Sequence, residues 1–253
     1  MAVSDVSYWD NYNSFISRTN YREVFRSTMN RISSELHISL DSVKSVLFFG
    51  AGDGQCEIEF LEICAIYVSN LTAIDNDDKS IELLKANLRN SLPRVEAVVI
   101  NADFNSWKGP EEPVNLVSLF NVLYYCGSSE RKELFKKIHD HWLTAGGFVA
   151  IASGRDTEFP RNGDEIYERF GAPVVLWKDI EADFLDIGFV KRHAYDMQIE
   201  RDFSNPDEAL LRFYQYQYDY PVPLGDIRDA IKELYGEGTI NEYYTFALFQ
   251  RVK

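Results

Sequence analysis

The stretch VLFFGAGDG at positions 46–54 decides the fold class of this chain. A short apolar run with the residues of a strand leads into Gly50, Gly52 and Gly54, and a helical pattern follows directly. Glycines allow a sharp turn and let a ligand approach the backbone, and the first N–H groups of a helix favour a polar ligand. The pattern therefore predicts a ligand-binding turn, with a plain tight turn between strand and helix as the alternative.

Acidic residues follow the next two predicted strands. The strand predicted at 70–74 ends at Asp75, and the strand predicted at 95–100 leads to Asp103 and Phe104. An acid at the end of the second strand can accept hydrogen bonds from both ribose hydroxyls of a nucleoside. Asp103 is placed to accept a hydrogen bond from an adenine amino group, and the Phe104 ring would lie beside the base. A helix cap or a plain loop acid is the alternative for Asp103.

Strand and helix patterns alternate along the rest of the chain. Other strands are predicted at 45–49, 114–120, 148–152 and 243–249, and helices at 58–68, 79–88, 130–143, 176–185 and 227–234. The alternation and the apolar strands predict a parallel, doubly wound sheet that is buried on both faces. Two further helices are expected at 8–16 and 24–32, with Thr19–Asn20 between them as a stop and a new N-cap. The tract 210–220 fits both a strand and a helix.

The composition excludes several classes of protein. The net charge is −14, and no cluster of Lys and Arg is dense enough to bind nucleic acid. Three cysteines without a CxxC pair indicate neither a disulfide framework nor a zinc site. No signal-peptide pattern or membrane-length apolar run is present in the sequence. We therefore expect a cytoplasmic monomer that uses no metal, acts on a small molecule and has no nucleic-acid or membrane partner.

The spacing of the glycines distinguishes between two classes of cofactor that such a turn can bind. A dinucleotide fingerprint is GxGxxG, and Gln55 occupies the place of its third glycine. The GxGxG spacing found here resembles the first motif of class I methyltransferases, which use S-adenosylmethionine. The alternatives are an NAD-type oxidoreductase and a methyltransferase fold that binds a cofactor or partner without catalysis.

The segment NVLYY at 121–125 resembles the histamine N-methyltransferase family. Tyr8, the segment 167–171, Leu210–Leu211 and the segment 245–248 also match that family in order. The resemblance implies an α/β fold: a Rossmann-like seven-stranded, mostly parallel sheet with helices on both faces and a small substrate-covering region. It also implies that the tyrosine-rich tract is helical. The chain would comprise an N-terminal helical cap at 1–44, an S-adenosylmethionine-binding core at 45–153, and a substrate-covering segment that completes the sheet at 154–253.

The same resemblance implies contacts to the cofactor. Tyr8 would close over S-adenosylmethionine, Gly50 would pass close to its amino-acid part, and Asp75 would bind its ribose. Ser80 would contact the adenosine, and Phe120 would pack near the cofactor at the end of the fourth strand. The full set of expected cofactor residues is Tyr8, Gly50, Gly52, Gly54, Asp75, Ser80, Asp103, Phe104 and Phe120.

The positions that bind the methyl acceptor in that family are changed in this chain. The family's acid near the N-terminus falls at Asn20, its glutamine before LYY at Asn121, and its asparagine on the last strand at Tyr244. One of its pocket tryptophans falls at Tyr167. Loss of the acid removes a charge-assisted contact to an ammonium group, so we expect N-methylation of a different amine or imidazole-type acceptor. Asn121 and Tyr125 are the expected catalytic residues, and Asn20, Asn121, Tyr125, Tyr167 and Tyr244 are expected to orient the acceptor.

Overall fold

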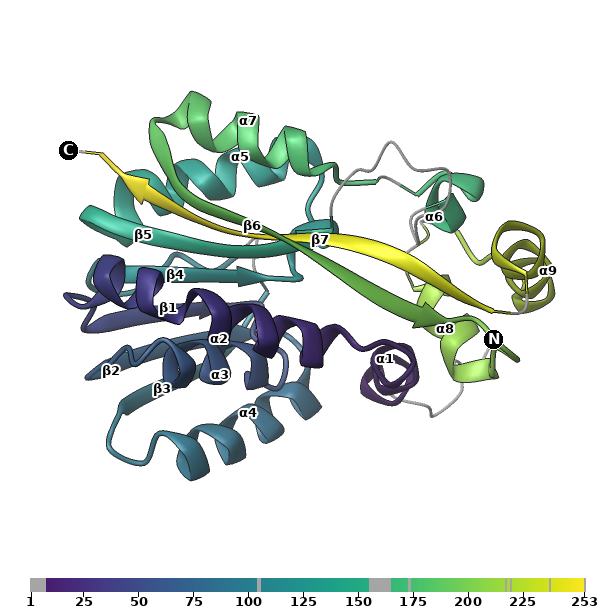
Figure 1. Ribbon diagram of the computed structural model, residues 1–253, viewed down its shortest axis with the longest axis horizontal. Helices are drawn as coiled ribbons and strands as arrows, with labels where there is room; N and C mark the ends of the chain where they lie inside the picture. Colours follow the sequence, from purple (N-terminus) through teal and green to yellow (C-terminus); the bar gives the residue numbers. More distant parts are fainter. Residues whose placement is uncertain are drawn as a thin grey trace. The chain divides into compact units, whose positions relative to one another are not determined.

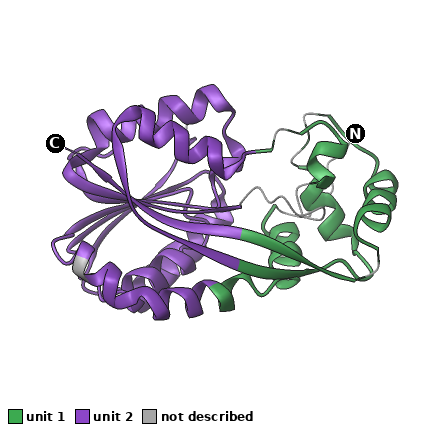
Figure 2. Cartoon of the chain, turned by 45° about the horizontal axis from the view of Figure 1, so that its top comes forward, with its two compact units in different colours: residues 1–24, 156–174, 198–243 green, residues 25–155, 175–197, 244–253 purple. Residues whose placement is uncertain are grey.

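The computed structural model describes residues 8–103, 106–154, 165–172, 174–216, 218, 220–236 and 238–252. The chain forms two compact units, which Figure 2 shows in different colours. Unit 1 comprises residues 1–24, 156–174 and 198–243, and unit 2 comprises residues 25–155, 175–197 and 244–253. Each unit is therefore assembled from segments that are separated in the sequence.

A seven-stranded sheet with the order β3-β2-β1-β4-β5-β7-β6 organises the fold (Figure 1). Its strands are β1 Ser45–Phe49, β2 Asn70–Asp75, β3 Glu96–Asn101, β4 Val114–Phe120, β5 Leu143–Gly154, β6 Phe189–Asp202 and β7 Thr239–Arg251. Neighbours among β1 to β5 are parallel, and β7 is antiparallel to β5. The strand order reverses at β1, so the carboxyl ends of β1 and β4 lie side by side at the edge where such sheets bind ligands.

Helices cover both faces of this sheet in unit 2. They are α2 Tyr21–Leu40, α3 Gln55–Ile63, α4 Asp78–Ser91, α5 Ser128–Lys137 and α7 Trp177–Ile187, and the first turn of α2 lies in unit 1. Leu47 and Phe49 of β1 pack in one core cluster with residues of α5 and α7, such as Phe135. On the opposite face, Phe60 of α3 contacts Phe120 at the end of β4. Figure 1 shows α5 and α7 on one side of the sheet and α3 and α4 on the other.

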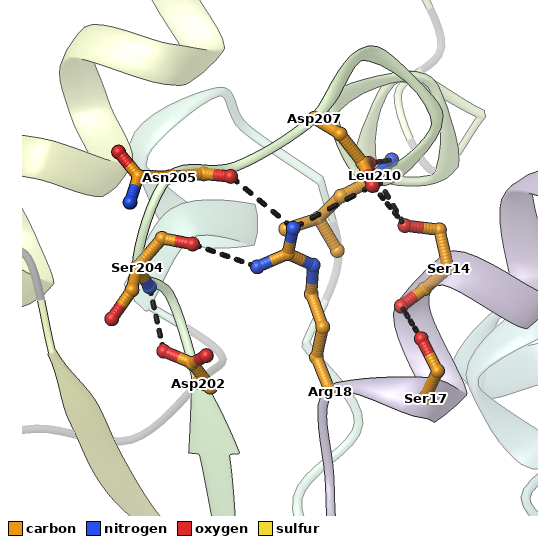
Figure 3. Close-up of polar contacts among 8 residues, drawn as sticks. All are labelled: Ser14, Ser17, Arg18, Asp202, Ser204, Asn205, Asp207 and Leu210. Atoms are coloured by element: carbon orange, nitrogen blue, oxygen red, sulfur yellow. Dashed lines mark hydrogen bonds and ion pairs between the residues drawn. The ribbon is translucent and has the colours of Figure 1, made fainter.

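Unit 1 contains α1 Tyr8–Ser17, α6 Glu165–Arg169, α8 Glu208–Gln215 and α9 Leu224–Tyr235. The connection between α1 and α8 is polar at one end (Figure 3). Asp207 caps α8 by accepting the Leu210 N–H at 2.8 Å, and it also accepts the Ser14 hydroxyl at 2.8 Å. Arg18 lies 3.5 Å from the same carboxylate and donates to the Ser204 carbonyl at 2.8 Å. One carboxylate thus stabilises the start of α8 and holds α1 against it.

A buried ion pair lies elsewhere in unit 1. Arg201 on β6 and Glu242 on β7 are only 1% and 6% exposed, and their bidentate hydrogen bonds measure 2.7 and 2.9 Å. The Arg201 guanidinium also lies 3.7 Å from the centre of the Phe15 ring and donates to the Phe15 carbonyl. These contacts replace the hydration that both charges lose on burial.

The sequence predictions for the fold are largely confirmed. Strands β1 to β4 lie where the apolar runs predict them, and the seven-stranded, mostly parallel sheet is present. Within the ambiguous tract 210–220, residues up to Gln215 belong to helix α8, so the helical alternative is correct there. The helix predicted at 130–143 is shorter, because α5 ends at Lys137 and a π-helical turn, η2 Ile138–Trp142, leads into β5.

Candidate cofactor and acceptor site

The turn after β1 adopts a left-handed backbone conformation, which glycine tolerates. Gly50, Gly52 and Gly54 have φ angles of 66°, 53° and 71°, a region that side chains disfavour. A Cβ on Gly54 would overlap the end of the Leu84 side chain of α4, which would have to shift to make room for it. A Cβ on Gly52 would meet no described atom within 4 Å. The Gly52 backbone therefore borders open space, as a close approach by a ligand requires.

Asp75 at the end of β2 is held against this turn. Its Oδ2 accepts the Gly52 N–H at 2.8 Å, and its Oδ1 accepts the Asp77 N–H at 3.0 Å. Burial raises the pKa of the Asp75 carboxyl, and hydrogen bonds from the amides of Asp77, Gly52 and Asn76 oppose that rise. A carboxylate has about four acceptor positions, so lone pairs remain for the two hydroxyls of a ribose.

Ser80 and Asp103 have structural contacts of their own. Ser80 is buried, and its N–H donates to Asp77, the N-cap of α4, at 2.7 Å. The Asp103 backbone carbonyl accepts the amides of Ser106 and Trp107 after β3. Contacts of Ser80 and Asp103 to an adenosine stay predictions. Phe104, which the sequence places beside the base, lies outside the described residues.

Phe120 ends β4, and Asn121 directly follows it, next to the turn after the neighbouring strand β1. Phe120 is 5% exposed and packs against Phe25, Phe60 and Phe246, with ring centroids 5.5, 5.7 and 6.1 Å away. Asn121 has a φ of 53°, and its N–H donates to the Ala152 carbonyl at 2.8 Å. Its side-chain Oδ1 is buried and has no hydrogen-bond partner within the described part of the chain. A positive φ together with a buried oxygen that lacks a partner among the described residues makes Asn121 a candidate, and its contact to a ligand stays a prediction.

The tyrosines that follow are surface residues. They belong to the short 3-10 helix η1 Leu123–Tyr125, where Tyr124 and Tyr125 are 37% and 45% exposed. Their ring centroids lie 4.3 Å apart. Neither ring is therefore part of the hydrophobic core in the described structure. Leu123 of the same turn does belong to the core.

The remaining predicted residues lie partly in the other unit. Tyr8, Asn20 and Tyr167 belong to unit 1, whereas Tyr244 belongs to unit 2 and pairs with Gly154 across β7 and β5. Within unit 1, Tyr8 contacts the Phe213 ring, and Tyr167 contacts the Tyr214 ring. The Oδ1 of Asn20 accepts the Glu200 N–H at 2.7 Å, so this oxygen holds the second half of β6 instead of capping α2. Acceptor contacts of these residues stay predictions.

One polar residue was missed by the sequence reasoning. Asn11 of α1 is fully buried, and neither its Oδ1 nor its Nδ2 has a hydrogen-bond partner among the residues the structure describes. The signal was present in the sequence, because Asn11 lies on the same helix face as the aromatic Tyr8 and Phe15. A carboxamide on a helix face that is otherwise aromatic makes Asn11 a candidate functional residue.

Comparisons with known proteins agree with this geometry. Residues 46–147 match the model of a protein family described as a methyltransferase domain. No curated protein sequence matches the chain. The N-methyltransferase NodS from Bradyrhizobium japonicum WM9, solved with S-adenosyl-L-homocysteine, is 15% identical, with a TM-score of 0.56 over 95% of this chain and 100% of that chain.

Other solved structures with this fold carry different activities in their names. The cyclase SpnF is 14% identical, with a TM-score of 0.51 over 88% of this chain and 81% of that chain. The O-MT segment of StiE is 17% identical, with a TM-score of 0.50 over 88% of this chain and 74% of that segment. At such identities the likeness establishes the fold alone.

This chain has the Rossmann-like fold of these solved methyltransferases, and residues 46–147 match the model of a methyltransferase domain. The described residues contain no cluster of His, Cys, Asp and Glu side chains able to hold a metal ion. None of their helices combines the length and hydropathy that a membrane crossing requires.

Proposed function

We propose that this protein binds S-adenosylmethionine and methylates a nitrogen atom of a small amine or imidazole-type molecule. The observation that carries the proposal is the buried Oδ1 of Asn121, which has no hydrogen-bond partner among the residues that the structure describes. A carbonyl oxygen accepts hydrogen bonds, and an N–H of an acceptor would supply the missing donor. The resemblance of NVLYY to the histamine N-methyltransferase family supports the same class of acceptor.

The residues present fit the cofactor. The lone pairs that remain on Asp75 suit two ribose hydroxyls, and the open space at Gly52 suits the close approach of a bound molecule. When bound, S-adenosylmethionine supplies a methyl group on a sulfonium, so the methyl carbon is already activated toward a nucleophile. The chain then mainly has to hold the acceptor in line and in the correct protonation state.

Asn121 would orient the attacking nitrogen. Its Oδ1 accepts one N–H of a neutral amine or imidazole and thereby fixes the direction of the nitrogen lone pair. The rings of Tyr124 and Tyr125 present exposed aromatic faces, which favour the positive charge that develops on nitrogen as it becomes methylated. Afterwards the methylated nitrogen releases its extra proton to solvent, and no side chain is required as a strong base.

Two measurements test this proposal in sequence. Calorimetry with S-adenosylhomocysteine tests whether the protein binds the cofactor, and we expect a 1:1 stoichiometry. Radiolabelled S-adenosylmethionine is then offered with panels of imidazoles, amines and phenols, and label is expected in nitrogen compounds. Transfer to phenols alone would contradict the choice of nitrogen. Cofactor binding without transfer to any panel would favour a binding protein, and a lack of binding would refute the whole proposal.

A further inference from the structure

One edge of strand β6 has no neighbour among the described strands, because β6 lies at the end of the sheet order. Near the end of the strand, residues of unit 1 cover this outer edge. The Glu200 carbonyl accepts the Asn20 N–H at 3.2 Å, and the Asp202 N–H donates to the Arg18 carbonyl at 2.8 Å. Glu200 and Asp202 therefore direct their backbone groups outward, away from β7.

The same edge stays open toward the start of the strand, within unit 2. Alternate residues of a strand direct their N–H and C=O groups to the same side, so residues 192, 194 and 196 face outward like Glu200. Exposure alternates without interruption from residue 192 to residue 201, so no bulge changes this order. Arg192, Ala194 and Asp196 are all exposed, and no strand of the described sheet pairs with them on this side. We call residues 191–197 the open edge.

The open edge carries opposite charges at equal distances from its centre. Arg192 lies two residues before Ala194, and Asp196 lies two residues after it. When a second copy of the strand pairs antiparallel with Ala194 opposite Ala194, Arg192 of each copy lies directly opposite Asp196 of the other. This arrangement has the two-fold symmetry that is commonest among protein dimers. The open edge is therefore complementary to itself.

The same two charges disfavour the neighbouring registers. Pairing centred on Arg192 or on Asp196 places like charges directly opposite each other, which destabilises a cross-strand pair. Pairing centred on residue 193 or 195 leaves both charges opposite uncharged residues. Exposed charges usually prevent an edge strand from pairing with other strands, and here they also select one register for pairing with a second copy.

We infer that the open edge of β6 is an interface at which a second copy of this chain pairs in antiparallel register about Ala194. Pairing joins the two seven-stranded sheets into one and supplies partners for the backbone groups of the edge. An interface of one strand from each copy is small, so the dimer is weak and forms only at high protein concentration. The inference differs from the monomer that the sequence predicts, and it is independent of methyl transfer.

Cysteine cross-linking of the full chain tests the register. Residues opposite each other in an antiparallel pair have Cα atoms roughly 4.5–5.5 Å apart, a separation that a disulfide can span. Ala194→Cys should therefore give a covalent dimer under mild oxidation. Val190→Cys is the matched control, because the two copies of this exposed residue would lie about 27 Å apart along the strands. The unsubstituted protein, with its three cysteines, gives the background, and equal cross-linking in both variants or none above background would overturn the inference.

Exchange of the two charges tests the ion pairs across the interface. Sedimentation of the full chain over a concentration series measures dimerisation, at about 0.15 M salt so that the repulsion between two copies of net charge −14 is screened. Arg192→Glu should weaken the dimer about tenfold, and so should Asp196→Arg, because each places like charges opposite each other. The two substitutions together should restore it.

A cooperative thermal unfolding transition shows that each of these variants is folded. A chain that stays monomeric at every concentration would overturn the inference. A double variant that dimerises no better than the single variants would overturn it as well, because the charges would then not lie opposite each other.

Discussion

The backbone amide of Gly52 donates a 2.8 Å hydrogen bond to Oδ2 of Asp75, joining the turn after β1 to the last residue of β2. This bond orients the carboxylate that the proposed function assigns to the ribose. It also ties the position of that carboxylate to a backbone with a φ of 53° at Gly52. A displacement of the glycine turn would therefore also displace the Asp75 carboxylate.

Removal of that acid should weaken cofactor binding. Asp75→Ala is expected to reduce the affinity for S-adenosylhomocysteine by about 1–3 kcal/mol, because buried hydroxyls would lose their acceptor. The matched control is Asp77→Ala, which removes the N-cap of α4 and should cost about 1 kcal/mol of stability without altering that affinity. Calorimetry and thermal unfolding give both values. An unchanged dissociation constant in Asp75→Ala would remove this residue from the site.

Cofactor affinity should decrease as the pH is lowered. Burial raises the pKa of Asp75 above the 3.8 of an ordinary aspartate, so this carboxylate takes up its proton at a higher pH than an exposed aspartate does. Protonation removes acceptor capacity, and the dissociation constant for S-adenosylhomocysteine should rise as the pH falls toward that pKa. Titrations across a pH series check this, and Asp75→Asn should flatten the profile. A parallel profile in the variant would point to another group.

Substitution of Asn121 should affect the acceptor more than the cofactor. Asn121→Ala is expected to raise the acceptor KM while the dissociation constant of S-adenosylhomocysteine changes little, since only the Oδ1 is lost. Asn121→Gly loses the same oxygen but suits the φ of 53°, so it should be roughly 1 kcal/mol more stable than the alanine variant. Similar kinetics in both variants would show that loss of the Oδ1, and not backbone strain, causes the change in KM. Equal effects on KM and cofactor binding would instead assign Asn121 a structural role.

The unpaired amide of Asn11 should reduce the stability of the ligand-free protein. Asn11→Leu has a similar shape and removes a buried group that lacks hydrogen bonds, so the melting temperature is expected to rise. Asn20→Leu provides the contrast, because the Oδ1 of Asn20 accepts the Glu200 N–H and its loss should lower the melting temperature. Differential scanning calorimetry compares the two. A lower melting temperature in Asn11→Leu would show that the amide is already satisfied.

The ion pair of unit 1 should show strong coupling. Arg201→Met alone leaves Glu242 buried without its partner and is expected to cost about 3–5 kcal/mol of stability. Arg201→Met combined with Glu242→Leu removes both charges and should recover much of that loss. Urea unfolding of the single and double variants measures the coupling. Additive losses would indicate that the two charges contribute independently.

The first half of the sheet could be predicted from the sequence because its strands are short apolar runs. Strand β1 is buried along nearly its whole length, and β4 likewise, so their composition is distinctive. Strand β6, Phe189–Asp202, was not predicted from its pattern. It lies at the edge of the sheet, and many of its residues are exposed or charged. Such a pattern does not distinguish a strand from an exposed helix or loop.

The site could be predicted only in part. The glycines and Asp75 follow from the order of motifs along the chain, and the structure places Gly52 and Asp75 in contact. The left-handed backbone of Asn121 and its unpaired oxygen depend on the packing around it, and the sequence contains no sign of either.

The interleaving of the two units has a consequence for how such a protein can change during evolution. Unit 1 consists of three stretches of the chain, and β7 passes from unit 1 into unit 2 between Tyr243 and Tyr244. A single recombination event could not exchange unit 1 for another module, because its parts are not contiguous in the gene. New specificity would therefore have to accumulate by point substitution within a conserved framework.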